Sequence, residues 1–419
     1  MARVVGNHVM RATPFRPPLK FHITCTFSTS SSIHSKNRKN KVNNSSSVVI
    51  NQNKVKRRTR SEKELDEETF LKRYGNDNSA HVPVLLGEVL DVFTSLTLRS
   101  FLDCTLGAAG HSSAIIRAHP EMQVYIGLDV DPIAHQMSQS QLKSIIDRDT
   151  LSALKVHTFL KNFKDVKSVL GEVADDLLYG GVNGILMDLG MSSMQVNDAE
   201  RGFSVLKNGP LDMRMNPKAT LKAEDILNSW PADEVGRVLQ KYGEESNWYS
   251  LQNRIVKARL HGGLHSTNEL VDLIQNSTSR SKGRQGWIKT ATRVFQALRI
   301  AVNDELKTLE DSIHACFESL SSGGRLAVIS FHSLEDRIVK QAFLSIMNCN
   351  EVDRGGVEDE GRELRKIHLD NVKEEAWIKQ VIRGQDGTIL TKRPITPSEK
   401  EETLNPRSRS AKLRVIQKA

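Results

Sequence analysis

The stretch that most constrains the fold is residues 101–131. An apolar run ends at Asp103, the small-residue turn Gly107-Ala-Ala-Gly110 follows, and a helix-like segment leads to a second apolar run ending at Asp129. This order predicts strand, glycine turn, helix and strand, which is one βαβ unit of a parallel sheet. Gly107 and Gly110 allow the backbone to turn sharply and to approach a ligand closely.

The same stretch indicates the kind of ligand. Asp129 lies 22 residues after Gly107, near the place where a nucleotide-binding unit puts the carboxylate that holds ribose hydroxyls. The spacing Gly-x-x-Gly differs from the dinucleotide and P-loop patterns, so a phosphate cradle is not favoured. Asp103 would repel a pyrophosphate and suits a cationic ligand. S-adenosylmethionine, with its ribose, ammonium and sulfonium, fits; an ordinary glycine turn in an α/β protein is the alternative.

Basic side chains are concentrated at the start of the chain, so the net charge of +9 does not describe the rest. Residues 1–61 hold thirteen Lys and Arg and no acid, whereas the remaining residues hold 46 basic and 50 acidic side chains. Such a leader, rich in Ser and Thr and without an apolar core segment, is typical of organelle transit peptides. Its hydroxyl content favours the chloroplast over the mitochondrion. A retained basic tail, with residues 54–60 as a nuclear signal or RNA-binding arm, is the alternative.

Neither membrane insertion nor metal binding is indicated by the sequence. No apolar run reaches the roughly 18 residues that suggest a membrane span. The cysteines form no Cys-x-x-Cys pair, so we predict no zinc site, no other metal and no disulfide framework, and a reducing compartment. They are Cys25, Cys104, Cys316 and Cys349.

Further strands follow the nucleotide-binding unit. The apolar runs 156–160, 184–188 and 325–330 predict a third, a fourth and a fifth strand. Phe163 follows the third strand and Asp188 ends the fourth, and ligands of doubly wound sheets lie beyond the carboxyl ends of the strands. We therefore expect Phe163 either on an adenine ring or in the core, and Asp188 near the reactive end of the cofactor.

Helical spacing of apolar residues sets the domain organisation. It predicts one helix from Thr292 to Leu320, stopped by Gly323-Gly324, and another over residues 81–93, with His81 as a capping or packing residue. The C-terminal basic residues either follow a phosphate backbone or form a solvated tail. The predicted parts are a leader 1–61, a linker 62–80, an α/β domain 81–195 and 291–349, an inserted helical domain 196–290, a charged excursion 350–387 and a basic C-terminal segment 388–419.

Long motifs follow one another from about His81 to Arg414. They are His81-Val-Pro-Val-Leu-Leu, Gly184-Ile-Leu-Met-Asp-Leu-Gly, Asp198-Ala-Glu-Arg-Gly-Phe-Ser, Gly209-Pro-Leu-Asp-Met-Arg-Met, Thr292-Arg-Val-Phe-Gln-Ala-Leu-Arg-Ile, Ser330-Phe-His-Ser-Leu-Glu-Asp-Arg, Lys392-Arg-Pro-Ile-Thr-Pro-Ser and Asn405-Pro-Arg-Ser-Arg-Ser-Ala-Lys-Leu-Arg. In this order they resemble the MraW/RsmH family, the small-subunit rRNA cytosine-N4 methyltransferases of bacteria and organelles. The resemblance implies a class I methyltransferase fold, a Rossmann-like α/β sheet whose helical insertion helps to recognise rRNA.

The resemblance also implies a binding site for S-adenosyl-L-methionine. Ala108-Ala109 stands where members often carry Arg-Gly or Gly-Gly, so we expect a negative φ at Ala109. Lys289-Thr290 replaces a His-Pro that usually precedes Ala-Thr-Arg, which leaves that His without a counterpart here. The implied cofactor contacts are Ala109, Gly110, His111, Asp129, Phe163, Asp188 and Gln195.

The reaction that the resemblance implies needs a proton acceptor. The exocyclic amine of cytosine is a weak nucleophile that must finally lose a proton. Asp188 is the first candidate for the acceptor, and His332, Ser333 and Asp336 are weaker candidates for substrate contact, or else parts of a structural loop. The predicted partner is small-subunit rRNA or the small ribosomal subunit, with the oligomeric state open, a dimer included. A non-catalytic ribosome-assembly factor and methylation of another RNA or of DNA are the alternatives.

Overall fold

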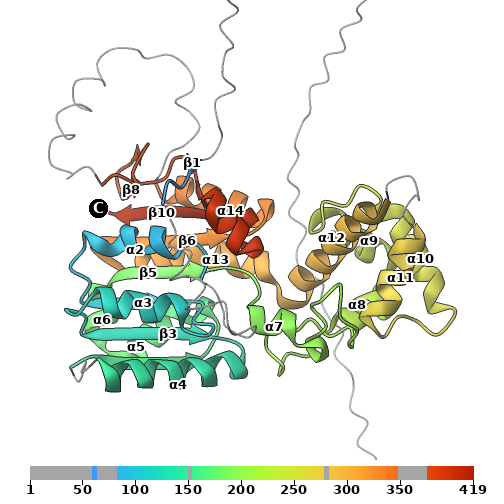
Figure 1. The fold of residues 1–419 in the computed structure, drawn as a ribbon, viewed down its shortest axis with the longest axis horizontal. Helices are drawn as coiled ribbons and strands as arrows, with labels where there is room; N and C mark the ends of the chain where they lie inside the picture. Colours follow the sequence, from blue (N-terminus) through green and yellow to red (C-terminus); the bar gives the residue numbers. More distant parts are fainter. Residues whose placement is uncertain (1–58, 64–82, 150–152, 278–282, 348–374) are drawn as a thin grey trace, which may run out of the picture. The chain divides into compact units, whose positions relative to one another are not determined.

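The computed structural model describes residues 59–63, 83–149, 153–277, 283–347 and 375–419. Predictions for His81, for most of the leader and for most of the charged excursion lie outside these described residues. The described residues form a mixed sheet with helices on both faces, together with a helical insertion (Figure 1). None of the described helices is long and apolar enough to cross a membrane.

The parallel half of the sheet is built from the predicted strands. Its order is β6-β5-β2-β3-β4, so the chain reverses its direction of winding between β2 and β5. Ligands bind at such a switch point. The fifth strand starts earlier than predicted, since the glycines expected to end a helix lie inside it. The bounds are β2 (Ser100–Asp103), β3 (Val124–Asp129), β4 (Lys155–Leu160), β5 (Val182–Asp188) and β6 (Leu320–Ser330).

The C-terminal segment completes the sheet. β10 (Lys412–Lys418) runs antiparallel to β6. Lys412 and Arg414 in it contact Asp336, so an exposed phosphate-binding strip or a solvated tail is wrong for these residues. Part of the predicted excursion is also structured, since Glu375 pairs with Arg325 at 2.6 Å. The short strands nearby are β7 (Ile382–Arg383), β8 (Gly387–Ile389) and β9 (Ile395–Thr396), and α16 (Glu399–Leu404) follows them.

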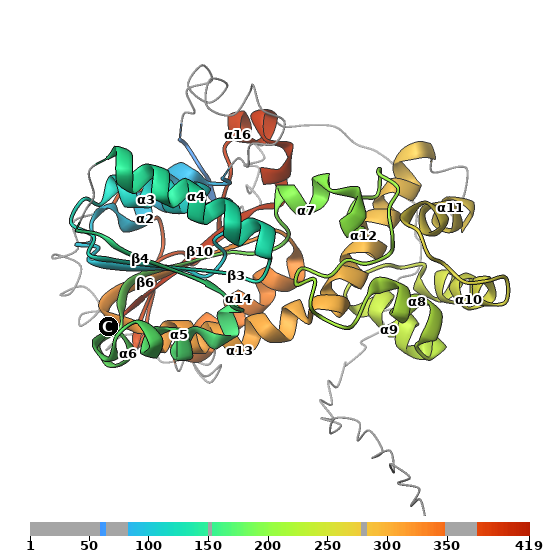
Figure 2. The same cartoon turned by 90° about the horizontal axis from the view of Figure 1, so that it is seen from below.

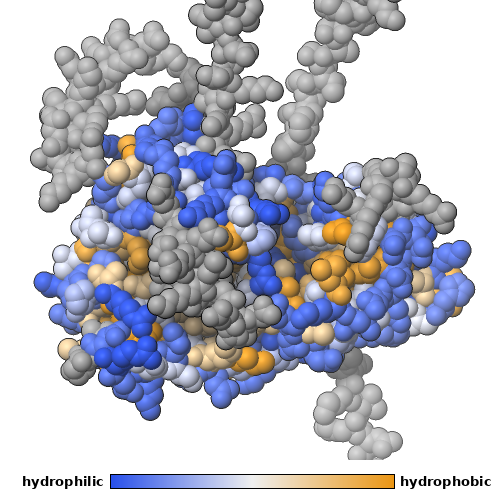
Figure 3. All heavy atoms as spheres, viewed as in Figure 1, coloured by the Kyte–Doolittle hydropathy of each residue, from blue (hydrophilic) through white to orange (hydrophobic). Residues whose placement is uncertain are grey.

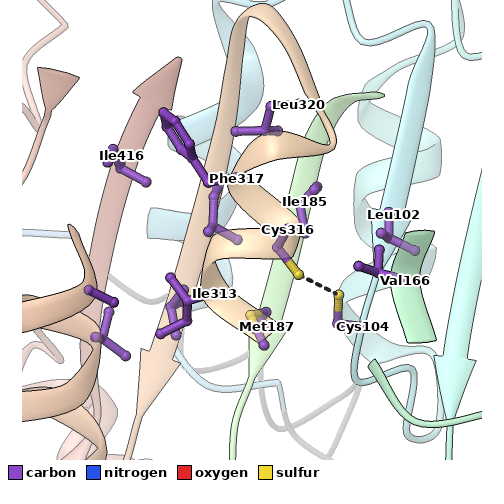
Figure 4. Packing of buried hydrophobic residues seen from close by; sticks show 14 of the residues in the cluster. Leu102, Cys104, Val166, Ile185, Met187, Ile313, Cys316, Phe317, Leu320 and Ile416 are labelled. Atoms are coloured by element: carbon purple, nitrogen blue, oxygen red, sulfur yellow. Dashed lines mark hydrogen bonds between the residues drawn. The ribbon is translucent and has the colours of Figure 1, made fainter. Parts of the chain in front are cut away.

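Helices cover the two faces of the sheet with separate apolar cores (Figure 2). One face carries α2 (Leu86–Thr94), α3 (Gly110–Ala118) and α4 (Pro132–Arg148). The other carries α5 (Val166–Val173), α6 (Asp175–Gly180), α13 (Glu305–Glu318) and α14 (Ser333–Ile346). In this second core the free thiols Cys104 and Cys316 point toward one another, with 3.9 Å between the sulfur atoms (Figure 4).

The insertion has its own apolar core and extends further than predicted. The predicted single helix over 292–320 is wrong, because Asp304 takes φ 48° and divides it into α12 (Gly283–Asn303) and α13. Val294, Leu298 and Val302 of α12 pack in the core of the insertion, so its boundary lies near residue 303 and not 290. The other helices are α7 (Ser193–Asn197), α8 (Ala223–Ser229), α9 (Ala232–Lys241), α10 (Trp248–Arg259) and α11 (Thr267–Ser277).

The outer face of the insertion is not uniformly polar. Figure 3 shows hydrophobic residues on the side where α8 and α12 lie in Figure 1, among hydrophilic ones. Leu206, Tyr249 and Leu260 are the large apolar residues of the insertion that stand most exposed among those described.

The end of the predicted leader belongs to the fold. β1 (Thr59–Arg60) pairs in parallel with β9, and Thr59 and Ser61 donate backbone hydrogen bonds to Pro394 and Thr396. The Ser61 hydroxyl also donates to the buried carboxylate of Glu88. The boundaries at 61 and 80 are therefore wrong for residues 59–63. Composition located the acid-free segment, but strand pairing with a distant segment leaves no compositional signal.

Removing β1 should destabilise the protein. We expect a chain starting at Glu64 to lose roughly 2–3 kcal/mol of unfolding free energy against one starting at Thr59, since a net hydrogen bond is worth about 1 kcal/mol. Urea denaturation measures the difference. Arg60→Ala in the longer chain is the control and should cost under about 1 kcal/mol, because the Arg60 ion pairs are partly exposed. Equal midpoints for the two chains would contradict the assignment of β1.

Candidate active site

A cavity of about 930 Å³ lies at the carboxyl ends of the parallel strands. The arrows of β3 and β5 point toward α7 in Figure 1. The cavity walls come from the turn after β2, the end of β3, residues 160–165, the loop after β5, the start of α13 and residues 405–407. Sites for small molecules span roughly 300–1,000 Å³. This cavity is therefore large enough for a nucleoside cofactor and part of a second molecule.

Asp129 closes the β3 end of the cavity. Its Oδ2 accepts a hydrogen bond from the Gly107 backbone N–H and its Oδ1 one from the Asp131 N–H, both at 2.8 Å. Burial raises the pKa of Asp129, although these two N–H groups oppose the rise. Each carboxylate oxygen keeps a lone pair after one such bond. The arrangement fits a carboxylate that accepts from two ribose hydroxyls.

The glycine turn differs from the sequence prediction at one position. Ala109 has φ 60°, so the expected negative φ is wrong. Its side chain is fully buried in the core beneath α3 and does not line the cavity, whereas Ala108, Gly110 and His111 do. The methyl group of Ala109 fills this core position. Glycine would adopt the positive φ freely, whereas in alanine the left-handed conformation costs about 1–2 kcal/mol.

Phe163 lies where the sequence predicts it, in the wall after β4. It is half-buried and contacts the core on one side. Asn162 begins the short 3-10 helix at Phe163, because its side chain accepts from the Lys164 N–H at 3.0 Å. The phenyl ring thus belongs both to the cavity wall and to the edge of the core, and stacking on adenine stays a prediction.

Asp188 ends β5 and lines the cavity. Its backbone N–H donates to the Thr105 hydroxyl at 2.7 Å, but its buried Oδ1 has no hydrogen-bond partner. Burial raises its pKa well above the usual range, and the negative charges of Asp103 and then Glu335 add to this effect. A carboxyl oxygen without a hydrogen-bond partner in a cavity wall fits a ligand that brings a donor or a positive charge.

Gln195 lines the cavity, but both the oxygen and the nitrogen of its side-chain amide are hydrogen-bonded within the protein. Its amide oxygen accepts from Ser192 N at 3.0 Å, closing a capping box at α7. Its amide nitrogen donates to Asp131 Oδ2 at 2.9 Å, an oxygen that also accepts from Arg201 at 2.7 Å. Gln195 and Arg201 thereby join the loop after β5 to the end of β3.

Comparison with known proteins agrees with this geometry. The model of the MraW methylase family matches residues 78–419. The chain belongs to this family. It is 41% identical over 338 residues to ribosomal RNA small subunit methyltransferase H of Heliobacterium modesticaldum, covering 81% of this chain and 98% of that protein. It is 37% identical over 345 residues to the protein of the same name from Clostridium botulinum, with the same coverage. This methylase therefore uses S-adenosylmethionine as its methyl donor.

The weaker substrate-contact candidates of this methylase do not line the cavity in the described structure. His332 is the N-cap residue of α14, and its Nε2 lies 3.0 Å from Glu335 Oε1. Ser333 donates to Glu244 of the insertion at 2.7 Å. Burial alone would raise the pKa of Asp336, but hydrogen bonds and charge from Arg414 and Lys412 lower it. The geometry corresponds to the structural-loop alternative.

Glu305 and Glu335 also line the cavity, although the sequence analysis did not predict them as site residues, and Arg299 lies behind them. Arg299 donates to both oxygens of Glu305 at 2.8 and 2.9 Å, and it lies 4.0 Å from Glu335. Glu305 and Glu335 line the cavity, and His332 lies close enough that these three could share a cation, but Arg299 already supplies the positive charge. The signal was present for Arg299 and Glu335, because both lie in family motifs; Thr105 and Asp131 lie in the predicted βαβ unit, but its pattern assigns no role to them.

Asp103 does not contact the cavity, so the prediction that it faces a cationic ligand is wrong. It is buried beneath the turn, where its carboxylate accepts from the Ser112 hydroxyl at 2.6 Å and the Thr105 N–H at 3.0 Å. Burial raises its pKa to about 6, although the Ser112 hydrogen bond opposes the rise.

Two substitutions test the conformation of the turn. Ala109→Gly should change the unfolding free energy by under about 1 kcal/mol, because relief of the left-handed backbone offsets the loss of one buried methyl. Ala109→Val should cost about 3 kcal/mol or more, since a branched side chain resists positive φ and overfills the core. Ala108→Val, half-exposed beside it, is the control. Chemical denaturation decides, and equal costs at 108 and 109 would contradict the assigned conformation.

Asp103 should make stability depend on pH. Because its folded-state pKa of about 6 exceeds the ordinary value of 3.8, the folded protein holds more protons between these pH values. Its contribution to stability therefore falls as pH rises from 4 to 6, by up to about 3 kcal/mol. The stability of Asp103→Asn relative to the native protein should rise by that amount between pH 4 and pH 7. Denaturation series at both pH values measure it, and a constant difference would refute the raised pKa.

Proposed function

We propose that this methylase transfers a methyl group to the exocyclic N4 amine of a cytidine in the decoding region of small-subunit rRNA in an organelle. The observation that carries the proposal is Asp188, whose carboxyl group lines the cofactor cavity and has one buried oxygen without a hydrogen-bond partner. The match to each of these two bacterial relatives covers 98% of the relative, and their names support rRNA as the substrate class.

The cavity residues fit the cofactor by chemical type. Asp129 offers acceptors for the ribose hydroxyls, Phe163 an aromatic face, and Gly107 a close backbone approach. Bound there, S-adenosylmethionine supplies the electrophilic methyl group. The protein contributes position and a proton acceptor, and Asp188 is the carboxyl that meets both needs, because its raised pKa makes it a better base than an ordinary aspartate.

Basic side chains at the cavity support an RNA substrate. Lys161, Lys164 and Arg407 are among the residues that form the walls. They come from the segment after β4 and from the C-terminal segment, and could contact phosphates beside a nucleotide that enters the cavity. A cytidine can present its amine there only when it is unstacked from its neighbours.

Location in an organelle belongs to the proposal. The acid-free leader rich in Ser and Thr supports import into the chloroplast, with the mitochondrion as the alternative. A fluorescent fusion of the full chain, viewed against markers of both organelles, tests it. Signal in the cytosol or nucleus would contradict organelle import.

Methyl transfer tests the activity. The full chain is incubated with labelled S-adenosylmethionine and undermethylated small subunits, naked rRNA or DNA, and the nucleosides and the modified position are then analysed. We expect label in N4-methylcytidine at one decoding-region nucleotide. Label in another RNA or in DNA would replace the proposed substrate, and absence of transfer from a chain that binds S-adenosylhomocysteine by calorimetry would contradict activity on these substrates.

The variant Asp188→Asn tests whether Asp188, and not another acid of the cavity, is the proton acceptor. We expect turnover to fall about 10²- to 10⁴-fold, the usual contribution of a general base, while S-adenosylhomocysteine still binds. Ser333→Ala is the control, since that hydroxyl contacts Glu244 and not the cavity, and it should change turnover only a few-fold. If turnover fell in Ser333→Ala and not in Asp188→Asn, the acceptor would lie elsewhere.

A further inference from the structure

His111 has one ring nitrogen whose role is set by the fold. Its Nε2 lies 2.9 Å from the Val84 carbonyl oxygen, in a buried position. A carbonyl only accepts hydrogen bonds, so Nε2 must carry the hydrogen. In a neutral ring, Nδ1 is then an acceptor. His111 also lies in the first turn of α3, where the positive end of the helix dipole favours the neutral ring.

That acceptor faces the carboxyl group of Asp188. Nδ1 of His111 lies 3.6 Å from Asp188 Oδ2. An ionised carboxylate and a ring nitrogen without hydrogen do not attract one another, whereas a protonated carboxyl group can donate to that nitrogen. The distance is slightly longer than a hydrogen bond, and catalytic contacts often shorten when ligands bind.

The other groups around Asp188 also favour its protonated form. Asp103 at the end of β2 and Glu335 on α14 both place negative charge near it. No Lys or Arg of the described residues forms an ion pair with Asp188; Arg299 lies at Glu305 and Glu335 instead. Burial, with these charges, raises the pKa of Asp188 well above the ordinary value.

We propose that His111 is a positioning residue of the methyl-transfer reaction, whose Nδ1 accepts the hydrogen bond of the Asp188 carboxyl group when that group is protonated. The inference rests on the proposed function, because it concerns the proton that the methylated amine loses. In that step the N–H bond breaks, its electron pair stays on nitrogen, and the proton forms an O–H bond on Asp188. His111 stabilises this protonated carboxyl and so strengthens Asp188 as a base.

Nuclear magnetic resonance on the ligand-free full chain tests the proposal without methyl transfer. With ¹⁵N-labelled histidine, we expect the His111 ring in the form that carries hydrogen on Nε2 at neutral pH. With ¹³C-labelled aspartate, we expect the Asp188 carboxyl to titrate well above an ordinary aspartate, and Asp188→Asn identifies its signal. A ring with hydrogen on Nδ1, or an Asp188 signal that titrates normally, would overturn the inference whether or not the chain methylates RNA.

Two variants distinguish this role from a packing role. His111→Asn places an amide near the position of Nδ1 and can still offer an acceptor to Asp188. His111→Gln reaches toward the Val84 carbonyl and lacks the ring acceptor. We expect the Asp188 pKa to fall by about one unit in the Gln variant, which corresponds to tenfold in proton affinity, and to fall less in the Asn variant.

The pH dependence of methyl transfer should follow the same order. The acid limb of kcat/KM should move to lower pH in His111→Gln, with a lower plateau because the base is weaker, and His111→Asn should restore part of both. S-adenosylhomocysteine calorimetry separates this from lost cofactor binding. Equal Asp188 titrations and pH profiles in all three proteins would overturn the proposal, and the proposed methyl transfer would stand on the native protein's own activity.

Discussion

The parallel register of β2, β3 and β5 is the constraint on which the site depends. It brings three strand-terminal acids, Asp103, Asp129 and Asp188, to one edge of the sheet. Asp103 is buried and Asp129 and Asp188 are partly buried, and a carboxylate removed from water is costly unless it is hydrogen-bonded or neutralised. The three acids differ in their hydrogen-bond donors and in whether they face the cavity, and this difference indicates a separate role for each.

Hydrogen-bond donors distinguish the three carboxyl groups. Asp103 receives a hydroxyl and a backbone N–H and stays under the turn, where it holds Ser112 of α3. Asp129 receives two backbone N–H groups and still faces the cavity. Asp188 has a buried oxygen without a donor and faces the ring of His111. Asp188, which has the fewest hydrogen-bond donors of the three, lies where the proposed reaction needs a proton acceptor. Unsatisfied polar groups and shifted pKa values are often found at functional sites.

A second set of contacts ties the insertion to the edge of the sheet. Arg201 donates to Asp131 at the end of β3, and to the carbonyl oxygens of Arg214 and Met215 in the insertion. Asn303, at the end of α12, accepts from the Met215 N–H and donates to the Met213 carbonyl. Asp304 then turns the chain into α13, whose first residue is Glu305 of the cavity wall. The insertion is thus connected to the cavity wall through a few charged and amide groups.

Much of this was predictable from the sequence, because the signals are local. Apolar runs ending in acids predict strands, and a glycine-containing turn followed by an acid at nucleotide spacing predicts Asp129 at a cofactor. The periodicity of apolar residues also predicted helices. It did not predict the break at Asp304, because the apolar spacing continues through this residue and only its backbone takes a left-handed conformation. The predicted negative φ at Ala109 is wrong for a related reason: packing in a buried core position can hold a residue at a positive φ that its own conformational preference opposes.

By itself, the sequence determined the α/β class, the order of the strands along the chain, the helical nature of the insertion and the acids at the strand ends, since each depends on residues close together in the chain. Only the tertiary structure decided which acids face the cavity, that β1 and β10 pair within the sheet, and that Asp336 lies against Lys412 and Arg414. These features depend on contacts between residues far apart in sequence. Such contacts set burial, and burial with its hydrogen bonds decides what a carboxyl group can do.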